Sequence, residues 1–498
     1  MSQLAVVKYN LLNLLSLKKL GLLFAVLGYL AVITFVPLDT GLTVVGQRVL
    51  AILVFAVIIW MTEAMDYSVS AIVIASMMVF FIGTAPQPDN IGAMIGSDKA
   101  LKIATEGFAA PATVLVASAL VLAAAMTKTG LDRRLALNIL SLVGTKTRNI
   151  FLGTILVGIL LAFMVPSSTA RCSCLVPIIL GIVAAFGMDK KSRFCGLLMI
   201  SMPNIVTLWN VGVPTAGAQN LIALGFLKDV FKVQLGWLEW VKIAFPYTIS
   251  CTVALYFLML WMVKPEVNDI QGGNETIKSD LAGLGPMSFD EKKLLFGFVG
   301  LLFLWSTQGL LHHFDTPAVT LFGVALMLLP GVGIMTWKEV QNRIPWGTLI
   351  LFGVSISLGN AMLNTKSAAW LAQIISATLG LESYSALAIV MVLGLFLLII
   401  HLGFASASAL TASMIPILIS IFQGLPQITN PMGVTLLMQF FISLGFILPV
   451  NSPQSMVAYG TESFTIKDFM RVGIALTIVV YVLSFIFSLT YWKWLGIL

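Results

Sequence analysis

The chain carries very little charge for its length. Only 10% of its 498 residues are Asp, Glu, Lys or Arg, whereas about 25% of the residues in a soluble domain are charged. Apolar residues make up 59% of the chain, and the mean hydropathy is +1.01. So few charges cannot solvate the surface of a 53.7 kDa globule, which excludes a soluble enzyme, a repeat scaffold and a disordered protein. The composition predicts a polytopic membrane protein.

The apolar segments also lack the alternation of polar and apolar residues that marks transmembrane β-strands. They are apolar on all sides, as membrane-spanning helices are, so we expect an all-α fold. No small-residue cleavage site follows the cationic start of the chain, so Lys18 and Lys19 are predicted to lead into a first span rather than into a signal peptide.

Residues that bind metals or carry out catalysis are scarce. The chain has three histidines and four cysteines, and Cys172-x-Cys174 has no further Cys or His near it in the sequence. We therefore expect buried free thiols, no metal site and no cofactor. There is no Gly-rich nucleotide loop, which excludes an ATP-driven pump. The net charge is +7, and the Lys and Arg residues that cause it lie mostly in loops. They form no basic patch interleaved with aromatic residues, so no nucleic-acid partner is expected.

One polar linker divides the apolar segments into two sets. We predict about 11 transmembrane helices plus two re-entrant helical hairpins, arranged as two inverted repeats. The predicted divisions are residues 1–43 (an N-terminal cytoplasmic segment and the first span), 44–263 (the first repeat), 264–293 (a cytoplasmic linker) and 294–498 (the second repeat).

The first hairpin is predicted from the distribution of positive charge. Residues 133–148 and 190–193 are rich in Lys and Arg, so both should face the cytoplasm. The segment between them must therefore enter the membrane and return. Its two arms are each shorter than the roughly 20 residues that a span needs. We predict a re-entrant hairpin at about residues 150–187, whose polar tip (residues 166–171) lines a cavity within the membrane.

The same pattern recurs in the second half. When Pro177 is aligned with Pro416, the two tip motifs coincide, which predicts a second hairpin at about residues 386–422. Each hairpin precedes a span that small and polar residues interrupt. These broken spans are predicted at residues 194–227, interrupted at 210–217, and at residues 434–460, interrupted at 449–453. An inverted repeat of this kind places a binding site at its interface.

The hairpin tips and broken spans present helix N-termini near the middle of the membrane. Each N-terminus is equivalent to about half a positive charge, so four of them suit a dianion, and hydroxyl groups there can donate to carboxylate oxygens. The alternative is that the Ser and Thr residues only cap these helices. The predicted substrate-binding residues are Ser167, Ser168, Thr169, Thr215, Gly217, Asn220, Ser406, Ala407, Ser408, Asn451, Ser452 and Pro453.

Two titratable residues lie inside this pattern. Arg171 follows the first tip, and an arginine at the centre of a bilayer costs at least about 3 kcal/mol. His401 lies five residues before Ser406. We predict that both balance the charge of a bound anion. The alternatives are an arginine that snorkels or pairs internally and a histidine that belongs to the core.

The residues at the tips and breaks resemble those of the divalent anion:sodium symporter superfamily, over the whole chain after the first span. The runs 166–171 and 401–408 look like its 2-oxoglutarate/malate translocator and citrate/succinate antiporter branch. This resemblance implies transport of C4–C5 dicarboxylates such as 2-oxoglutarate, malate, succinate and fumarate. It also implies a homodimer, in which a mobile transport domain moves against a scaffold like an elevator. The expected location is the bacterial cytoplasmic membrane, with the N-terminus in the cytoplasm.

The sequence departs from this family at the tips. Members carry Ser-Asn-Thr at both tips, but Ser168 and Ala407 stand at the asparagine positions here. An asparagine amide oxygen is a hard ligand that suits sodium, and alanine has no such ligand. We therefore expect a sodium-independent exchanger. The alternatives are a sodium-coupled dicarboxylate or citrate symporter, a channel and, in another class, a membrane-embedded transferase.

Overall fold

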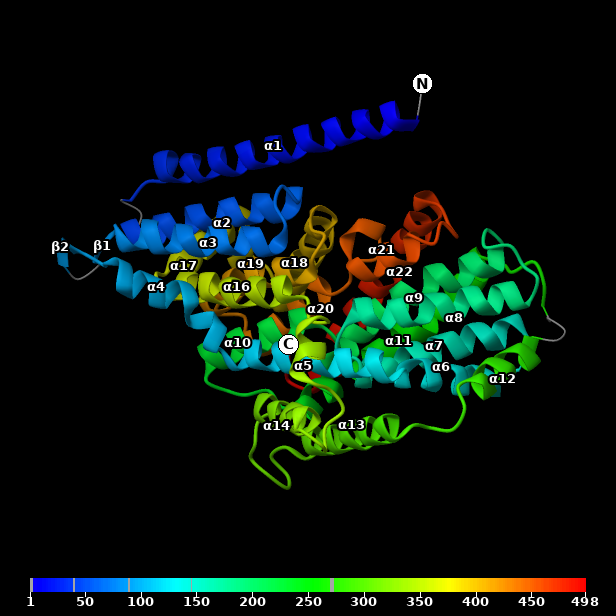
Figure 1. Ribbon diagram of the computed structural model, residues 1–498. Coiled ribbons are helices and arrows are strands. Elements are labelled where there is room, and N and C mark those ends of the chain that lie inside the picture. The colour runs from blue at the N-terminus through cyan, green and yellow to red at the C-terminus, as the bar shows by residue number, and fades with distance from the viewer. Residues whose placement is uncertain (1–2, 39–40, 88–89, 145, 269–272) are drawn as a thin grey trace.

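The computed structural model describes residues 3–38, 41–87, 90–144, 146–268 and 273–498. These residues are almost entirely helical (Figure 1), apart from the short antiparallel pair β1 (Pro86–Gln87) and β2 (Asn90–Met94). Within the described ranges, ten helices are long and apolar enough to cross a membrane. The predicted all-α polytopic fold class is therefore confirmed.

The N-terminal half of the fold consists of α1 (Gln3–Phe35), α2 (Val44–Thr62), α3 (Tyr67–Met77), η1 (Met78–Ile82), α4 (Ser97–Thr105), η2 (Glu106–Ala109), α5 (Pro111–Thr129), α6 (Leu131–Leu142), α7 (Thr147–Met164), α8 (Ser168–Ala185), α9 (Arg193–Gly212), η3 (Pro214–Ala216), α10 (Ala218–Phe231), α11 (Trp237–Met262) and α12 (Gly273–Gly283).

The C-terminal half consists of α13 (Phe289–Thr307), α14 (Thr316–Leu328), α15 (Trp337–Gln341), α16 (Trp346–Asn364), α17 (Ser367–Leu379), η4 (Leu381–Ser383), α18 (Ala386–Ile400), η5 (His401–Gly403), α19 (Ala407–Gly424), α20 (Pro431–Ile442), η6 (Pro449–Asn451), α21 (Pro453–Tyr459), α22 (Ile466–Leu489) and α23 (Tyr491–Trp494).

The two helical hairpins turn in the same way. In α7–α8, Ser167 is extended (φ −141°, ψ 112°) and its hydroxyl oxygen accepts a hydrogen bond from the backbone N–H of Ala170. In α18–α19, Ser406 has nearly the same conformation (φ −137°, ψ 115°) and caps Ala409. A serine hydroxyl at this position satisfies one of the free N–H groups of the first turn. The two tips therefore have equivalent local structures.

Both broken spans contain a short 3₁₀ turn between two helices. The first break separates α9 from α10 and contains η3, and the second separates α20 from α21 and contains η6. The second break is longer than predicted, because α20 already ends at Ile442. At Gly445 the backbone lies against the ring of His401, where an added Cβ would be 2.6 Å from Nε2. A larger residue at this position would therefore displace the ring or the backbone.

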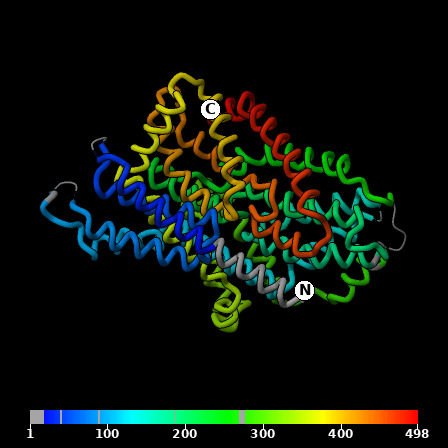
Figure 2. The backbone as a smooth tube through the Cα atoms, turned by 90° about the horizontal axis from the view of Figure 1, so that it is seen from above, coloured from blue at the N-terminus to red at the C-terminus, as the bar shows by residue number. Residues whose placement is uncertain are grey.

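Each hairpin packs against the broken span of the other half. Helix α8 contacts α21, and α19 contacts α10, whereas α16 packs against α3 and α19. Figure 1 shows α1 along one edge of the molecule and α13 and α14 at the opposite edge, and Figure 2 gives a second view of the same path. Helix α8 also contacts α9, and α19 also contacts α20, so the starts of α8, α10, α19 and α21 come together. The division into repeats at residues 44–263 and 294–498 stays a prediction.

The predicted linker, residues 264–293, contains a helix. Helix α12 packs against α6 and α8. Beyond α12, the Arg134 guanidinium donates to a Glu291 carboxylate oxygen at 2.6 Å and to the Gly285 carbonyl at 2.9 Å. The linker therefore attaches α6 to the start of α13. Helices α6 and α17 were not predicted from the sequence, because α6 is amphipathic and α17 is short.

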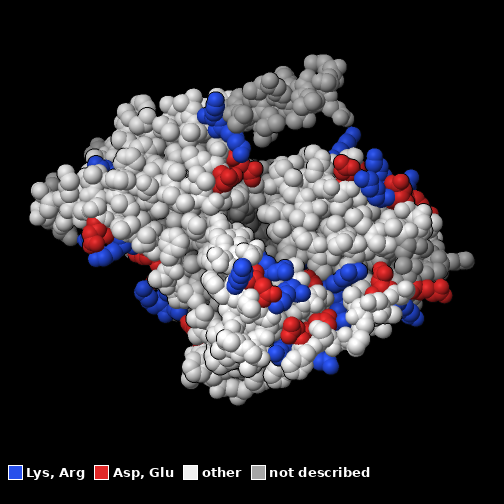
Figure 3. Space-filling model, viewed as in Figure 1, with Lys and Arg blue, Asp and Glu red and all other residues white. Residues whose placement is uncertain are grey.

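Charged residues gather in clusters at the surface. Figure 3 shows them in separate patches on an otherwise uncharged face. Lys128, in the last turn of α5, lies 2.7 Å from Glu339 of α15. Its hydrogen bond lowers the pKa of the Glu339 carboxyl, which lies outside the spans, to about 2. This distribution fits a molecule whose remaining surface faces lipid.

Candidate functional site

A cavity of about 360 Å³ lies where the two hairpin tips meet the two broken spans. The first two residues of four separate helices line it, namely those of α8, α10, α19 and α21. The residues in these positions are Ser168, Thr169, Ala218, Gln219, Ala407, Ser408, Pro453 and Gln454. The opposite wall comes from α5 and α16 and includes Val116 and Phe352.

The convergence of four helix starts gives the cavity a positive potential. The first N–H groups of a helix have no partner within that helix, and the helix dipole adds to their effect. Three of the four starts can offer N–H groups from their first residue, whereas Pro453 has none at that position. Helix N-termini of this kind bind anions. The cavity is therefore suited to a small anion with more than one negative group.

The tip serines differ in their internal hydrogen bonds. The Ser167 and Ser406 hydroxyls accept from backbone N–H groups at 3.3 and 3.4 Å, so their own hydrogens remain available to a ligand. The Ser168 hydroxyl lies 3.0 Å from Oδ1 of Asn210 and 3.2 Å from Nη2 of Arg171. Ser168 therefore links the tip to the first break.

Arg171 lies directly behind this tip. It is fully buried, and its Nη2 donates to Oδ1 of Asn210, to the hydroxyl of Ser168 and, at 2.8 Å, to the Ala216 carbonyl. Its Nε and Nη1 have no hydrogen-bond partner, and no carboxylate forms a salt bridge with it among the residues that the structure describes. Arg171 does not line the cavity, whereas its partners Ser168 and Asn210 do. Its role in balancing the charge of a bound anion stays a prediction.

His401 contributes its ring to the cavity wall. It is 3% exposed, and neither ring nitrogen has a hydrogen-bond partner in the described part of the chain. Gly445 lies against the ring. A buried imidazole without internal partners can accept or donate a hydrogen bond to a ligand.

Two asparagine amides hold the backbone of the tips and breaks. Nδ2 of Asn451 donates to the carbonyls of His401, Leu402 and Phe404 at 2.8 to 3.2 Å. Nδ2 of Asn220 donates to the Asn210 carbonyl at 2.6 Å and lies 3.4 Å from two further carbonyls of the first break. These amides donate hydrogen bonds to buried backbone carbonyls that have no partner within a helix.

The structure brings together most of the predicted site residues. Those that line the cavity are Ser167, Ser168, Thr169, His401, Ser406, Ala407, Ser408, Asn451, Ser452 and Pro453. Three predicted binding residues of the first break do not line the cavity. Thr215 faces another pocket and accepts from Nε1 of Trp237, Gly217 lies beneath the side chain of Gln219, and Asn220 is fully buried.

Several lining residues were not predicted. Asn210, Gln219 and Gln454 present amides to the cavity, and Nε2 of Gln454 donates to the Thr207 hydroxyl at 3.1 Å. Their position beside the breaks was a signal for them, since an amide within an apolar span needs a polar surrounding. Tyr67 and Thr348 also line the cavity from helix starts, and no sequence motif marks these two.

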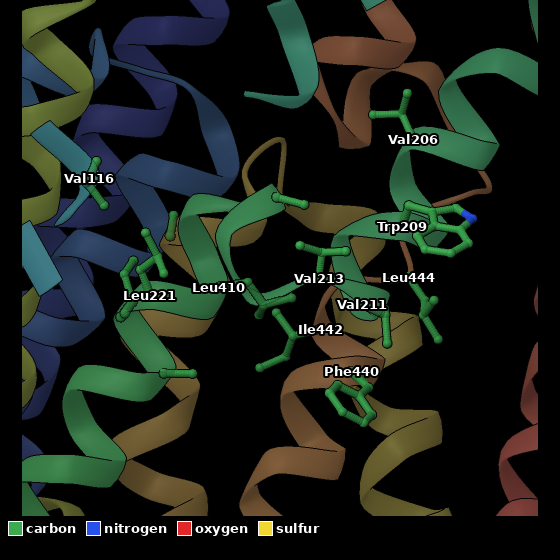
Figure 4. Close-up of a cluster of buried hydrophobic side chains, with 14 of the residues drawn as sticks. Val116, Val206, Trp209, Val211, Val213, Leu221, Leu410, Phe440, Ile442 and Leu444 are labelled. Atoms are coloured by element: carbon green, nitrogen blue, oxygen red, sulfur yellow. The ribbon is translucent and has the colours of Figure 1, made fainter. Parts of the chain in front are cut away.

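An apolar layer surrounds the polar tips. Figure 4 draws buried side chains of this layer, among them Val213 and Leu444 in the two breaks, Leu410 of α19 and Ile442 of α20. Such a layer keeps water away from the breaks and strengthens electrostatic interactions there. Among the described residues, no group of three or more His, Cys, Asp or Glu side chains could hold a metal ion.

Comparison with known proteins places the chain in a family. Residues 17–498 match the family model described as the sodium:sulfate symporter transmembrane region. A "Membrane protein" of Cupriavidus necator is 48% identical over 474 residues, which cover 95% of this chain and 92% of the relative.

Two relatives with more specific names are more distant. The citrate/succinate antiporter of Escherichia coli K12 is 28% identical, over 75% of this chain and 77% of the relative. The sodium-dependent dicarboxylate transporter SdcS of Staphylococcus saprophyticus is 27% identical, over 88% and 85%. Among solved structures, the YdaH transporter of Alcanivorax borkumensis shares the fold at 14% identity, with a TM-score of 0.55 over 86% of this chain and 97% of that one.

These matches agree with the resemblance seen in the sequence, and they exclude the alternative of a membrane-embedded transferase, because the family consists of transporters. The chain belongs to the sodium:sulfate symporter transmembrane-region family, within the divalent anion:sodium symporter superfamily.

Proposed function

We propose that this protein is a secondary active transporter of C4–C5 dicarboxylates such as 2-oxoglutarate, malate, succinate and fumarate. The observation that carries the proposal is the convergence of four helix N-termini on one cavity. One carboxylate would bind at each hairpin tip, where Ser167 and Ser406 donate hydroxyl hydrogens. The names of two relatives, a citrate/succinate antiporter and a dicarboxylate transporter, support the same substrate class.

We further propose that transport is exchange and does not require sodium. Nη2 of Arg171 is surrounded by a hydroxyl, an amide oxygen and a backbone carbonyl, which are the ligand types that a hard cation prefers. An arginine remains charged and cannot leave with the substrate. An empty carrier would keep this unpaired buried charge, which is costly to move through the membrane. A carrier loaded with a dianion would cross more easily.

The second candidate is sodium-coupled symport. The family description and the sodium-dependent relative favour it. In that case, backbone carbonyls at the tips would bind sodium in place of the missing asparagines. The two candidates share a substrate class and differ in the ion that balances its charge.

The mechanism that we propose is movement of the two hairpins and broken spans, as one transport domain, past α5 and α16. The protein would act as a homodimer in a bacterial cytoplasmic membrane, with its N-terminus in the cytoplasm. The bacterial relatives support this location.

The substrate class is tested by uptake into proteoliposomes that are preloaded with unlabelled dicarboxylate. Labelled 2-oxoglutarate, malate, succinate and fumarate should each enter and compete with one another, whereas sulfate, also a dianion, should compete weakly because it cannot reach both tips. Efficient uptake of sulfate with no uptake of dicarboxylates would contradict the proposal.

A further inference from the structure

A groove of about 320 Å³ runs along α13 and α14, at the edge of the molecule opposite α1 (Figure 1). The residues of α13 that line it, from Lys293 to Leu304, recur at intervals of three and four, so they share one face of the helix. The lining residues of α14, from Val319 to Met327, recur in the same way. The space is therefore a long groove that follows both helices.

The length of the groove matches one half of a lipid bilayer. Nζ of Lys293 donates to the carbonyl of Val332, in the segment that follows α14, at 2.7 Å. The start of α13 therefore lies beside the end of α14, and the two helices are antiparallel. From Lys293 to Leu304, α13 rises about 16 Å at about 1.5 Å per residue, and one leaflet is half of a hydrocarbon core about 30 Å thick. This length suits one extended acyl chain.

The walls of the groove are apolar. Among the described residues that line it, only Lys293 has a polar side chain. Leu301 and Met327 form the floor, at 4% and 6% exposed, whereas Phe296 and Phe322 stand at the edges, at 81% and 62% exposed. The groove is therefore open along one side, and its inner surface suits hydrocarbon.

One end of the groove carries an ammonium group that no carboxylate compensates. In the described part of the chain, Lys293 forms no salt bridge, and its Nζ lies 4.7 Å from the centre of the Phe289 ring. An ammonium group has three N–H donors, and the Val332 carbonyl accepts from one of them. Lys293 can therefore still donate to an anion at this end of the groove.

The other charges at the start of α13 do not cancel that of Lys293. Glu291 is bound to Arg134 at 2.6 Å, so this acid is already paired. Asp290 then stands alone against Lys292 and Lys293. The uncompensated charge here is positive, which attracts the phosphate of a lipid headgroup.

We propose that this groove is a binding site for an anionic phospholipid of the membrane. One acyl chain lies between α13 and α14, and the lipid phosphate binds the ammonium group of Lys293. Both helices pack against α5, which forms a wall of the substrate cavity, so the bound lipid stabilises that wall from outside. This inference does not depend on the proposed function.

The headgroup contact is tested by native mass spectrometry of the delipidated, full-length protein. We expect phosphatidylglycerol to bind more tightly than phosphatidylcholine, whose headgroup carries a compensating positive charge. Lys293→Gln should weaken binding of phosphatidylglycerol roughly twofold to fivefold, as expected for one partly exposed charge contact. Lys292→Gln, at an exposed position that does not line the groove, should have a smaller effect. Equal binding of the two lipids, or an equal effect of the two substitutions, would overturn the proposal.

Filling the groove tests the acyl-chain contact. Gly300→Leu should weaken binding of phosphatidylglycerol at least about tenfold, because the added side chain displaces part of the buried acyl chain. An added Cβ at Gly300 meets no atom within 4 Å, so the variant has room to fold. Gly181→Leu, at an equally open position on α8, is the control and should bind normally. Leu326→Trp fills the groove from α14 and serves where Gly300→Leu does not fold.

The location is tested with a phosphatidylglycerol that carries a photoactivatable diazirine in one acyl chain. Cross-links should fall on peptides that contain residues 296–304 and 319–327, and should be lost in Gly300→Leu. Cross-links confined to other helices, or unchanged binding in a folded variant with a filled groove, would contradict the site. If filling the groove separates a dimer into monomers while lipid binding is unchanged, the groove binds a second copy of the chain, which would also overturn the proposal.

Discussion

At the scale of single residues, Ser167 and Ser406 combine two roles. Each hydroxyl oxygen caps a helix, and each hydroxyl hydrogen is free to meet a carboxylate. Hydrogen bonds to a charged group contribute about 1.5–3 kcal/mol. Replacing either serine with alanine should therefore raise the half-saturation concentration for dicarboxylate roughly tenfold or more, measured as initial uptake into proteoliposomes preloaded with unlabelled dicarboxylate.

The loss of a cap alone needs a matched control. Ser385 caps α18 in the same way, with its oxygen 3.3 Å from the backbone N of Ala388, but it does not line the cavity. Ser385→Ala should lower thermal stability by an amount similar to that of Ser406→Ala, with an unchanged half-saturation concentration. If all three variants bind substrate normally, the tip serines are only caps.

Arg171 allows a test of the proposed exchange mechanism. Arg171→Gln removes the buried charge, so the empty carrier should return more easily, and uptake into empty liposomes should rise relative to uptake into preloaded ones. Arg171→Lys keeps the charge and should preserve the dependence on internal substrate. If uptake by both variants depends equally on internal substrate, the charge of Arg171 does not enforce exchange.

The sequence predicted the tip residues better than the break residues. A tip serine that caps a helix faces the cavity, because the chain turns there. Within a break, however, a single rotation of the backbone decides whether a side chain faces the cavity or the protein. Thr215 and Asn220 turn away from the cavity, whereas Asn210 and Gln219, in the same segment, line it or bind its lining. Composition contains no information on that rotation.

At the scale of helices, the site is defined by where helices begin. Four helix starts, with about half a positive charge each, match two carboxylates better than one. A monocarboxylate would leave part of these donors without partners in a poorly hydrated cavity, which is costly. Lactate and acetate should therefore inhibit succinate uptake only weakly at concentrations at which fumarate inhibits strongly. Equal inhibition by acetate would contradict a site that binds its substrate at both ends.

Most helix positions followed from the sequence. The outer ends of both hairpins lie within three residues of the predicted bounds 150–187 and 386–422, whereas α8 begins inside the polar tip, at Ser168. The short helix α17 and the amphipathic helix α6 were missed, since neither forms a long apolar run. The length of the second break was also underestimated, because the packing of Gly445 on His401 depends on residues far apart in the chain.

At the scale of the whole molecule, the link between α6 and α13 is a buried ion pair. Glu291 accepts from Arg134 and from the backbone N of Ser288. Although burial alone would raise its pKa, these hydrogen bonds hold the pKa of the Glu291 carboxyl below its ordinary value. A lowered pKa in the folded state means that the ionised form stabilises the fold above the unfolded-state pKa, and that this contribution is lost as the pH falls.

Glu291→Gln should therefore lower the melting temperature most at neutral pH. The difference from the wild-type protein should shrink as the pH falls below about 4.3, the ordinary value for a glutamate. Thermal unfolding of both proteins in detergent, followed at several pH values, measures this difference. Asp290→Asn, at the neighbouring position of α13, is the control and should show a much smaller dependence. A difference that grows toward acidic pH would contradict the role of this pair.

The central claim is that a fixed buried cation replaces a transported sodium ion, so that one dicarboxylate enters only as another leaves. The most direct measurement is uptake of labelled succinate into proteoliposomes that are either empty or preloaded with unlabelled dicarboxylate, each with and without a sodium gradient. We expect rapid uptake only into preloaded liposomes, at the same rate with and without sodium. Strong, sodium-stimulated uptake into empty liposomes would contradict this account and would identify a symporter.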